Sequence, residues 1–340
     1  MTMKAFVRFR ASTATIAFFV VAFSMVLLHV ATGQAPPSNL GQSPAQIHTL
    51  KITVLSTMLV GDRKGIGEWG FSALVEADGH RILVDTGAHP ETVLRNARDL
   101  NIDLSDVQEV ILTHNHWDHV GGLMTLRREF MKKNPAAFSI AHVAKGIFYS
   151  RPSPEGEDNE MIAIRKEYEG TGGKFIEHAV AVEIFPGAWL SGPVPRKYPE
   201  HNWSVKGKVQ TPEGLVEDTI AEDQSLVLNT PRGLVVLTGC GHAGIVNILT
   251  YATTKYADRP VYGIVGGLHL FPAKDEQVDW TGDEFKEFKV ANLLGAHCTG
   301  IEAVYRLRDR AGLTRKSAVV GTVGSTFTLT EGIVTGPLAQ

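Results

Sequence analysis

Four side chains that commonly bind metal ions fall within six residues of this chain, directly after the apolar segment Val110-Ile111-Leu112. They are His114, His116, Asp118 and His119. Because alternate side chains of an extended segment share a face, the first two histidines can point at one ion. If the chain then turns into a helix, Asp118 and His119 reach a neighbouring position about 3.5–4 Å away, as two-metal hydrolytic sites require. We therefore expect two divalent metal ions, with zinc as the first candidate and iron or manganese as alternatives.

The surrounding pattern predicts the elements that must position this loop. We expect strands at residues 50–59, 71–76, 81–85, 107–113, 137–142, 225–228, 234–238, 261–265 and 317–329. We expect helices at residues 91–100, 123–133, 157–169, 245–255, 284–294 and 301–310. Strands precede crossover helices in both halves, which predicts two packed β-sheets with helices outside them. Between about 149 and 214 the composition shifts to proline, glycine and charge, so we expect an insertion or lid there.

The N-terminal segment is typical of a targeting sequence. Three basic side chains in the first ten residues precede an apolar run over 11–30, and small residues follow at 31–33. We expect residues 1–33 to be a cleaved signal peptide, or else an uncleaved anchor, because the run is long enough to span a bilayer. Residues 34–47 then form a flexible lead-in to a folded domain over 48–340. This predicts an exported protein, periplasmic or secreted, that meets a membrane only if the segment stays uncleaved.

Composition excludes several classes of protein. The 340 residues include 33 basic and 36 acidic side chains, for a net charge of -3, so we expect no nucleic-acid partner. The two cysteines, Cys240 and Cys298, are too few for a disulfide scaffold or a four-cysteine zinc module. The sequence does not indicate an oligomeric state.

One further motif spells a dinucleotide-binding fingerprint, Gly65-Ile66-Gly67-Glu68-Trp69-Gly70. The next residues, Phe71 to Glu76, have the pattern of a strand rather than of the helix whose N-terminus would hold a pyrophosphate. We therefore interpret this stretch as a glycine-rich turn, placed at the rim of the metal site.

The motif His114-x-His116-x-Asp118-His119 after a strand resembles the signature of the metallo-β-lactamase superfamily, and Arg81 to Gly87 resembles its upstream strand that ends in an aspartate, here Asp85. Four further motifs resemble the dihydropterin-methyl-ribofuranosylaminobenzene-phosphate synthase-like branch: Glu68-Trp69-Gly70-Phe71-Ser72, Leu237 to Asn247, Gly266-Gly267-Leu268-His269-Leu270 and His297-Cys298-Thr299-Gly300. The resemblance implies an α/β fold, the αββα four-layer sandwich, and a metal-dependent hydrolase. It also implies that Asp85 orients a ligand histidine.

This chain departs from the superfamily pattern at two ligand positions. Superfamily members carry a histidine ahead of a middle strand, but residues 221–225 contain none, and Cys240 replaces the aspartate that bridges both metals. His242 is the first candidate for the missing ligand, ahead of Cys240, Glu222 and Asp223.

Two histidines compete to close the second metal site. His297 fits because it stands between a late strand and a helix, and His269 is the alternative; the other would contact a ligand or the substrate. Cys298 could form a disulfide with Cys240 if their Cα atoms lie within about 7 Å.

The chemistry expected is hydrolysis by metal-activated water of a small ester, phosphoester, lactone or amide. Asp118 has two expected roles, as a metal ligand and as the catalytic group that accepts a proton from the attacking water. Arg151, Arg196 and Lys197 are available to meet an anionic substrate. The alternatives are a di-iron redox enzyme on the same fold, a synthase-like activity on a pterin-linked compound, and a non-catalytic exported metal-binding protein.

Overall fold

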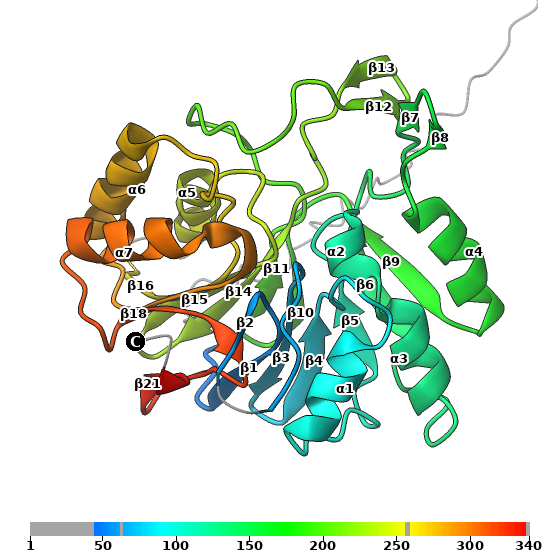
Figure 1. The fold of residues 1–340 in the computed structure, drawn as a ribbon, viewed down its shortest axis with the longest axis horizontal. Coiled ribbons are helices and arrows are strands. Elements are labelled where there is room, and N and C mark those ends of the chain that lie inside the picture. Colours follow the sequence, from blue (N-terminus) through cyan, green and yellow to red (C-terminus); the bar gives the residue numbers. More distant parts are fainter. Residues whose placement is uncertain (1–43, 62–63, 256–258, 338–340) are drawn as a thin grey trace, which may run out of the picture. The chain divides into compact units, whose positions relative to one another are not determined.

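The computed structural model describes residues 44–340 except 62–63, 256–258 and 338–340. The predicted signal peptide or anchor at 1–33 lies outside the described residues, as does most of the lead-in. Within the described ranges, no helix is both long and apolar enough to cross a bilayer. Figure 1 shows the fold of the described residues.

Two large β-sheets form the centre of the fold. The first sheet has eight strands, in the spatial order β21 (Gly332–Val334), β20 (Thr326–Thr328), β1 (Leu50–Ser56), β3 (Ser72–Ala77), β4 (His80–Val84), β5 (Glu109–Ile111), β6 (Ile140–Ala144) and β9 (Lys174–His178). The second sheet has seven strands, in the order β10 (Val182–Phe185), β11 (Ala188–Leu190), β14 (Ser225–Thr230), β15 (Gly233–Thr238), β16 (Val261–Gly266), β17 (Leu293–Gly295) and β18 (Ala318–Val320). In each sheet the first pairings are antiparallel and the last three are parallel.

Helices cover the outer face of each sheet (Figure 1). Against the first sheet pack α1 (Thr92–Asp99), α3 (Leu123–Phe130) and α4 (Met161–Gly170), and against the second pack α5 (Ile245–Lys255), α6 (Asp275–Glu287) and α7 (Ile301–Arg310). The short helix α2 (Trp117–Val120) and a 3₁₀ turn (His297–Thr299) lie in loops. Each covering helix buries an apolar stripe; α1, for example, buries Val93, Leu94 and Ala97. The result is the predicted αββα sandwich, which confirms the fold class.

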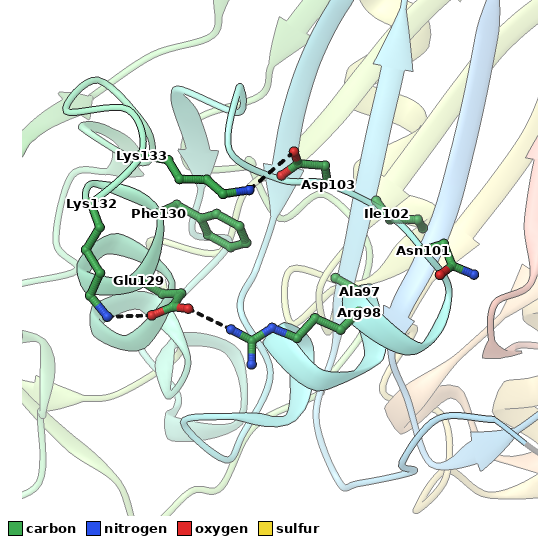
Figure 2. A pocket seen from close by; sticks show the side chains of 9 residues that line it. All are labelled: Ala97, Arg98, Asn101, Ile102, Asp103, Glu129, Phe130, Lys132 and Lys133. Carbon is green, nitrogen blue, oxygen red and sulfur yellow. Dashed lines mark hydrogen bonds and ion pairs between the residues drawn. The ribbon is translucent and has the colours of Figure 1, made fainter.

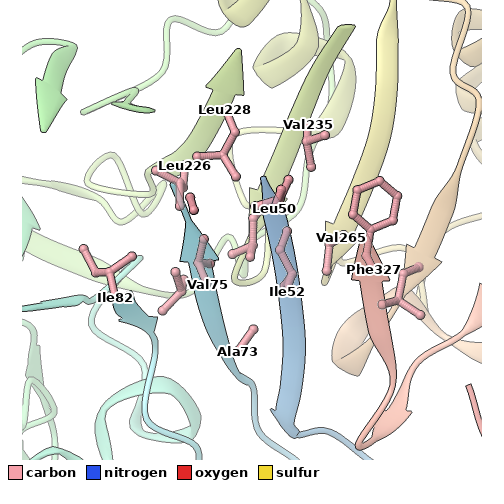
Figure 3. Close-up of a cluster of buried hydrophobic side chains, with 14 of the residues drawn as sticks. Leu50, Ile52, Ala73, Val75, Ile82, Leu226, Leu228, Val235, Val265 and Phe327 are labelled. Atoms are coloured by element: carbon pink, nitrogen blue, oxygen red, sulfur yellow. The ribbon is translucent and has the colours of Figure 1, made fainter. Parts of the chain in front are cut away.

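The two sheets bury a common core between their inner faces (Figure 3). Ile52 and Val75 from the first sheet and Leu226 and Val235 from the second are all fully buried. Strands β14 and β15 are buried along their whole length, which explains their nearly continuous apolar sequence. Burial on both faces holds β14, β15 and β16 in place, and with them the loops that follow β15 and β16.

Two sequence-based elements were wrong. The helix expected at 284–294 is α6, which ends at Glu287; Lys289 then takes a positive φ of 55° and the chain enters β17. The single strand expected at 317–329 is three short strands, β18, β19 (Thr322–Val323) and β20. Gly321 and Gly324 separate them, and the chain passes there from the second sheet to the first. The hydrophobic pattern did not show the start of α6 because most of this helix's surface is polar. It did not show the breaks at Gly321 and Gly324 because apolar residues continue on both sides of them.

The stretch from 149 to 214 is less separate than its composition indicates. Helix α4 and strand β9 belong to the first sheet's layers, and β10 and β11 pair into the second sheet. Outside the sheets lie two small hairpins, β7–β8 (Pro152–Ser153 with Gly156–Glu157) and β12–β13 (Lys208–Thr211 with Gly214–Glu217), and the segment from 191 to 207. A further two-stranded pairing joins β19 to β2 (Leu59–Val60). Finally, β3 begins at Ser72, so the glycine-rich motif at 65–70 precedes a strand, as expected.

Candidate metal centre

The potential metal ligands follow the carboxyl ends of parallel strands in both sheets. His114 follows β5, Cys240 and His242 follow β15, His269 follows β16 and His297 follows β17. In open α/β sheets the carboxyl ends of parallel strands are the usual place for ligands. Here the parallel halves of two sheets bring their loops to one place, so residues 178 positions apart become neighbours, as His119 and His297 show.

The histidine loop adopts the predicted extended-to-helical path. His116 is extended, with φ -65° and ψ 142°, and helix α2 begins at the next residue. The Nε2 atom of His114 lies 3.0 Å from Nδ1 of His116, so these two rings converge. Asp118 and His119 come from α2, with a carboxylate oxygen 4.0 Å from Nε2 of His119. The loop thus presents two pairs of donors side by side, as the spacing predicted.

Three groups of donor atoms meet at Cys240. They are His114 with Cys240 and His242, His119 with Cys240 and His297, and Cys240 with His269 and Cys298, each with donor atoms within 4.8 Å of one another. The Sγ atom of Cys240 lies 3.1 Å from Nε2 of His119. Cys240 is therefore the donor that the groups share, at the position where the superfamily pattern has a bridging aspartate.

His297 and His269, the two candidates to close the second metal site, have different neighbours in the structure. Nε2 of His297 lies 3.2 Å from an Asp118 oxygen, and its ring is 5.0 Å from that of His119. The ring of His269 instead lies 4.5 Å from that of His242, and its backbone N–H donates to Sγ of Cys298 at 3.3 Å. The geometry thus groups His297 with Asp118 and His119 and places His269 beside His242.

Asp85 fixes the orientation of the His119 ring through the nitrogen that faces away from Cys240. This carboxylate is fully buried, accepts hydrogen bonds from the N–H and hydroxyl of Thr113, both at 2.8 Å, and lies 2.6 Å from Nδ1 of His119. With Nδ1 bonded in this way, Nε2 is left to face Cys240. Burial opposes protonation of His119, but the negative charges of Asp85 and Asp118 raise its pKa to about 9. The non-glycine φ of 54° at Asp85 marks a backbone held in an uncommon conformation at this site.

The sequence pattern missed the residues that hold His242. Nδ1 of His242 is hydrogen-bonded to the carbonyl oxygen of Asn202, from the segment outside the sheets. Two residues earlier, Glu200 accepts hydrogen bonds from the N–H groups of Val246 at 3.1 Å and Asn247 at 2.8 Å, at the start of α5. No spacing in the sequence relates this polar segment to the turn that carries His242, which follows 40 residues later.

The donor set fits divalent metal ions. Nε2 of His242, Nδ1 of His297 and Nδ1 of His269 are buried without a hydrogen-bond partner. Each such atom costs about 1–3 kcal/mol unless something satisfies it. Burial lowers the pKa of His114 and His242 well below the usual value, which keeps these rings in the neutral form that binds metal. Burial opposes ionisation of Asp118, but the charge of His119 and a hydrogen bond from His297 lower its pKa.

The remaining candidates from the sequence are Cys298, for a disulfide with Cys240, and the carboxylates Glu222 and Asp223 before β14, for the missing ligand. The two cysteines are free thiols whose Sγ atoms lie 3.2 Å apart, beyond the roughly 2.05 Å of a disulfide bond. Glu222 forms an ion pair with Arg151 at 2.7 Å, whereas Asp223 accepts the N–H of Ala243, in the turn that carries His242, at 3.1 Å. Neither carboxylate belongs to the three donor groups.

The cations expected to meet an anion are engaged elsewhere. Arg151 is buried and is paired with Asp218 and Glu222, so its charge is already compensated within the protein. The guanidinium of Arg196 lies over the ring of Trp203 and donates to two backbone carbonyls, and Lys197 lies over the ring of Tyr198.

A surface pocket of about 520 Å³ lies between α1, the loop after it, and α3. Its charged groups pair with one another: Glu129 with Arg98 and Lys132, both at 2.6 Å, and Lys133 with Asp103 at 3.8 Å (Figure 2). It contains none of the donor groups, so we do not assign the chemistry to it.

Comparison with known proteins agrees with this architecture. The family model described as the metallo-beta-lactamase superfamily matches residues 70–257, and the chain belongs to that superfamily. It is 28% identical over 267 residues to the 7,8-dihydropterin-6-methyl-4-(beta-D-ribofuranosyl)-aminobenzene-5'-phosphate synthase of Methanocaldococcus jannaschii, covering 76% of this chain and 90% of that one.

Two solved structures extend the comparison. Tm1679, described as a metal-dependent hydrolase of the beta-lactamase superfamily, is 28% identical, with a TM-score of 0.66 over 82% of this chain and 98% of its own. The metallo-beta-lactamase fold protein YhfI from Bacillus subtilis is 14% identical, with a TM-score of 0.50 over 82% and 99%, and shows a shared fold. The predicted family and the predicted branch likeness are therefore both confirmed.

Proposed function

We propose that this chain is a metal-dependent hydrolase that acts on a small ester, phosphoester, lactone or amide. The observation that carries the proposal is that two donor groups, each with two histidines, share Cys240, and that some of their buried ring nitrogens have no hydrogen-bond partner. We call these two the histidine groups. His114, His116 and His242 would hold one divalent ion, and Asp118, His119 and His297 the other, with Cys240 between them. We propose zinc first, because imidazole, carboxylate and thiolate all suit it, with iron or manganese as alternatives that also bind imidazole and carboxylate.

The protein's own residues would prepare the reaction as follows. Bound divalent ions supply Lewis acidity and make a water molecule a nucleophile near neutral pH. Burial opposes ionisation of Asp118, but the charge of His119 lowers its pKa, which favours the carboxylate form that a metal ion binds. The same carboxylate would accept the proton of the attacking water. Asp85 fixes the ring of His119, and the Asn202 carbonyl fixes that of His242, so the donor atoms are oriented before substrate arrives.

A synthase-like reaction is the second candidate. It is supported by the 28% identity to the Methanocaldococcus jannaschii enzyme named as a synthase, which the match covers over 90% of its length. We further propose that the protein is exported, on the grounds of the N-terminal pattern, and that it has no nucleic-acid partner, on the grounds of the near-neutral charge.

The test is a panel of chromogenic esters, phosphodiesters, lactones and lactams, assayed with metal-loaded protein, after chelation and after metal is restored. We expect hydrolysis of at least one class that is lost on chelation and recovered with zinc. The His116→Ala variant should lose both activity and bound metal. Full activity after complete removal of metal would refute the proposal, whereas turnover only with a second, condensing substrate would favour the synthase-like reaction.

A further inference from the structure

Two partly exposed aromatic side chains lie next to the candidate metal centre. Trp69, in the loop before β3, is 39% exposed, and Phe271, after β16, is 51% exposed. Their ring centroids lie 5.2 Å apart, with the planes at 80° to each other. The Trp69 ring is 5.0 Å from the ring of His297, and the Phe271 ring is 5.3 Å from that of His269. We call this pair the Trp69–Phe271 wall.

The backbone on either side of Trp69 is fixed. The preceding residue, Glu68, is 8% exposed and accepts hydrogen bonds from the Ser56 hydroxyl at 2.6 Å and the Ala88 N–H at 2.9 Å. Gly70 lies so close to Ala88 that a Cβ would come within 2.7 Å of that residue's backbone nitrogen. The N–H of Phe71 donates to the carbonyl of Asp118 at 3.2 Å, which ties the loop to helix α2. Trp69 is therefore held beside the centre by its surroundings.

The backbone of Phe271 is fixed as well. Its N–H donates to the carbonyl of Cys298 at 3.2 Å, in the turn that carries His297. On the other side, a Cβ on Gly300 would lie 3.0 Å from its Cα, so the two turns are in close contact. Single exposed apolar residues are common on protein surfaces, but two adjacent large rings on rigid backbone next to a polar centre are characteristic of ligand sites.

The two rings of the wall present aromatic faces and edges to a ligand, and neither ring carries a charge. In the described part of the chain, the ring contacts of Trp69 and Phe271 are with each other, His297 and His269. Beside Phe271, Arg306 lines a cavity of about 250 Å³ together with Asp275, and the two side chains form an ion pair at 2.6 Å. An aromatic group packed on such rings gains about 0.5–1.5 kcal/mol beyond the burial of its area.

We propose that the Trp69–Phe271 wall binds an uncharged aromatic or other flat apolar group of the substrate, on the side of the centre formed by His297 and His269. This group would lie next to the bond that is broken, so the wall selects substrates by that group rather than by a negative charge. The proposal uses the metal centre of the proposed function as the neighbouring subsite, but its binding test does not require turnover.

Two hydroxamates that differ only in the group facing the wall provide the test. Both benzohydroxamate and acetohydroxamate carry the same metal-chelating group, and their affinities for zinc-loaded protein can be measured by calorimetry. We expect benzohydroxamate to bind about tenfold more tightly, because its ring packs on the wall. Trp69→Ala should reduce this ratio to near one with zinc content unchanged, and Trp69→Phe should keep most of it. The control is Ile162→Ala on α4, a residue 40% exposed, which should leave the ratio as it is.

The outcomes separate the wall from the metal centre. Equal affinities of the two hydroxamates in the wild type, or a ratio that Trp69→Ala leaves intact, would overturn the wall. If zinc-loaded protein binds neither hydroxamate, the proposed metal centre fails, and the wall is then tested alone with benzamide, which has the ring but chelates poorly. In that titration, followed by tryptophan fluorescence, we expect a saturable change that Trp69→Phe removes; no such change would overturn the wall.

Discussion

Cys240 and Cys298 differ in role although their sulfur atoms are in contact. Cys240 belongs to all three donor groups, whereas Cys298 belongs only to the one with His269. A thiolate in the shared position is a softer donor than the carboxylate that the superfamily pattern places there. The sequence showed the replacement but not its consequence, because the distance from Cys240 to His119 depends on how two sheets pack.

Single serine substitutions distinguish the two cysteines. In cobalt-substituted protein, a thiolate ligand gives a sulfur-to-metal charge-transfer absorption. We expect Cys240→Ser to abolish this band and to weaken metal binding at least tenfold, because the shared donor is lost. Cys298→Ser is the matched control, at a residue just as buried, and should keep the band and the metal content. A band that survives Cys240→Ser and disappears with Cys298→Ser would contradict the assignment.

At the scale of elements, the segment from Glu200 to Asn202 connects the region outside the sheets to the start of α5. Glu200 accepts two N–H groups of the first turn of that helix, and the Asn202 carbonyl holds His242. Gly244 makes this contact possible, since a Cβ there would lie 2.3 Å from the carboxyl carbon of Glu200. The composition of 149–214 indicated a lid, whereas this part of it positions a candidate ligand.

A glycine pair tests this element. Gly244→Ala should displace Glu200 and with it Asn202, lowering the free energy of unfolding by about 2 kcal/mol or more and weakening metal binding. Gly172→Ala is the control, because Gly172 also has a positive φ, 81° against 92°, but a Cβ there meets nothing within 4 Å. It should cost about 1 kcal/mol through backbone strain alone and leave metal binding unchanged. Equal effects of both variants on metal affinity would refute the positioning role.

Glu200 also predicts a pH dependence. Burial raises its pKa to about 7, against 4.5 for an ordinary glutamate. Between these values the folded state binds more protons than the unfolded state, so the free energy of unfolding falls as pH rises from about 4.5 to 7 and levels off above that. The loss attributable to Glu200 is a few kcal/mol at most.

Glu200→Gln tests this sign. Denaturant unfolding of metal-free protein at pH 5, 6, 7 and 8 should show a smaller decline with pH in Glu200→Gln than in the wild type. Glu287→Gln, at an exposed position on α6, is the control and should follow the wild type. If all three proteins show parallel curves, Glu200 does not have the raised pKa.

For the whole molecule, local signals predicted much of the fold, and long-range packing decided the rest. The histidine loop, α5 and α7 follow from spacing and periodicity that are visible within a dozen residues. The crossing of the chain at Gly321 and Gly324, and the choice of His297 over His269 beside Asp118, depend on which strand end meets which. Those relations join residues more than 150 positions apart, and no local pattern contains them.

The most direct test of the central claim is the number of metal ions bound per chain, measured by elemental analysis of protein loaded with zinc and freed of excess. The two histidine groups that meet at Cys240 predict two ions per wild-type chain, and fewer than two in His116→Ala and in His297→Ala. Wild-type protein that retains no metal, or variants that retain as much as the wild type, would contradict the account.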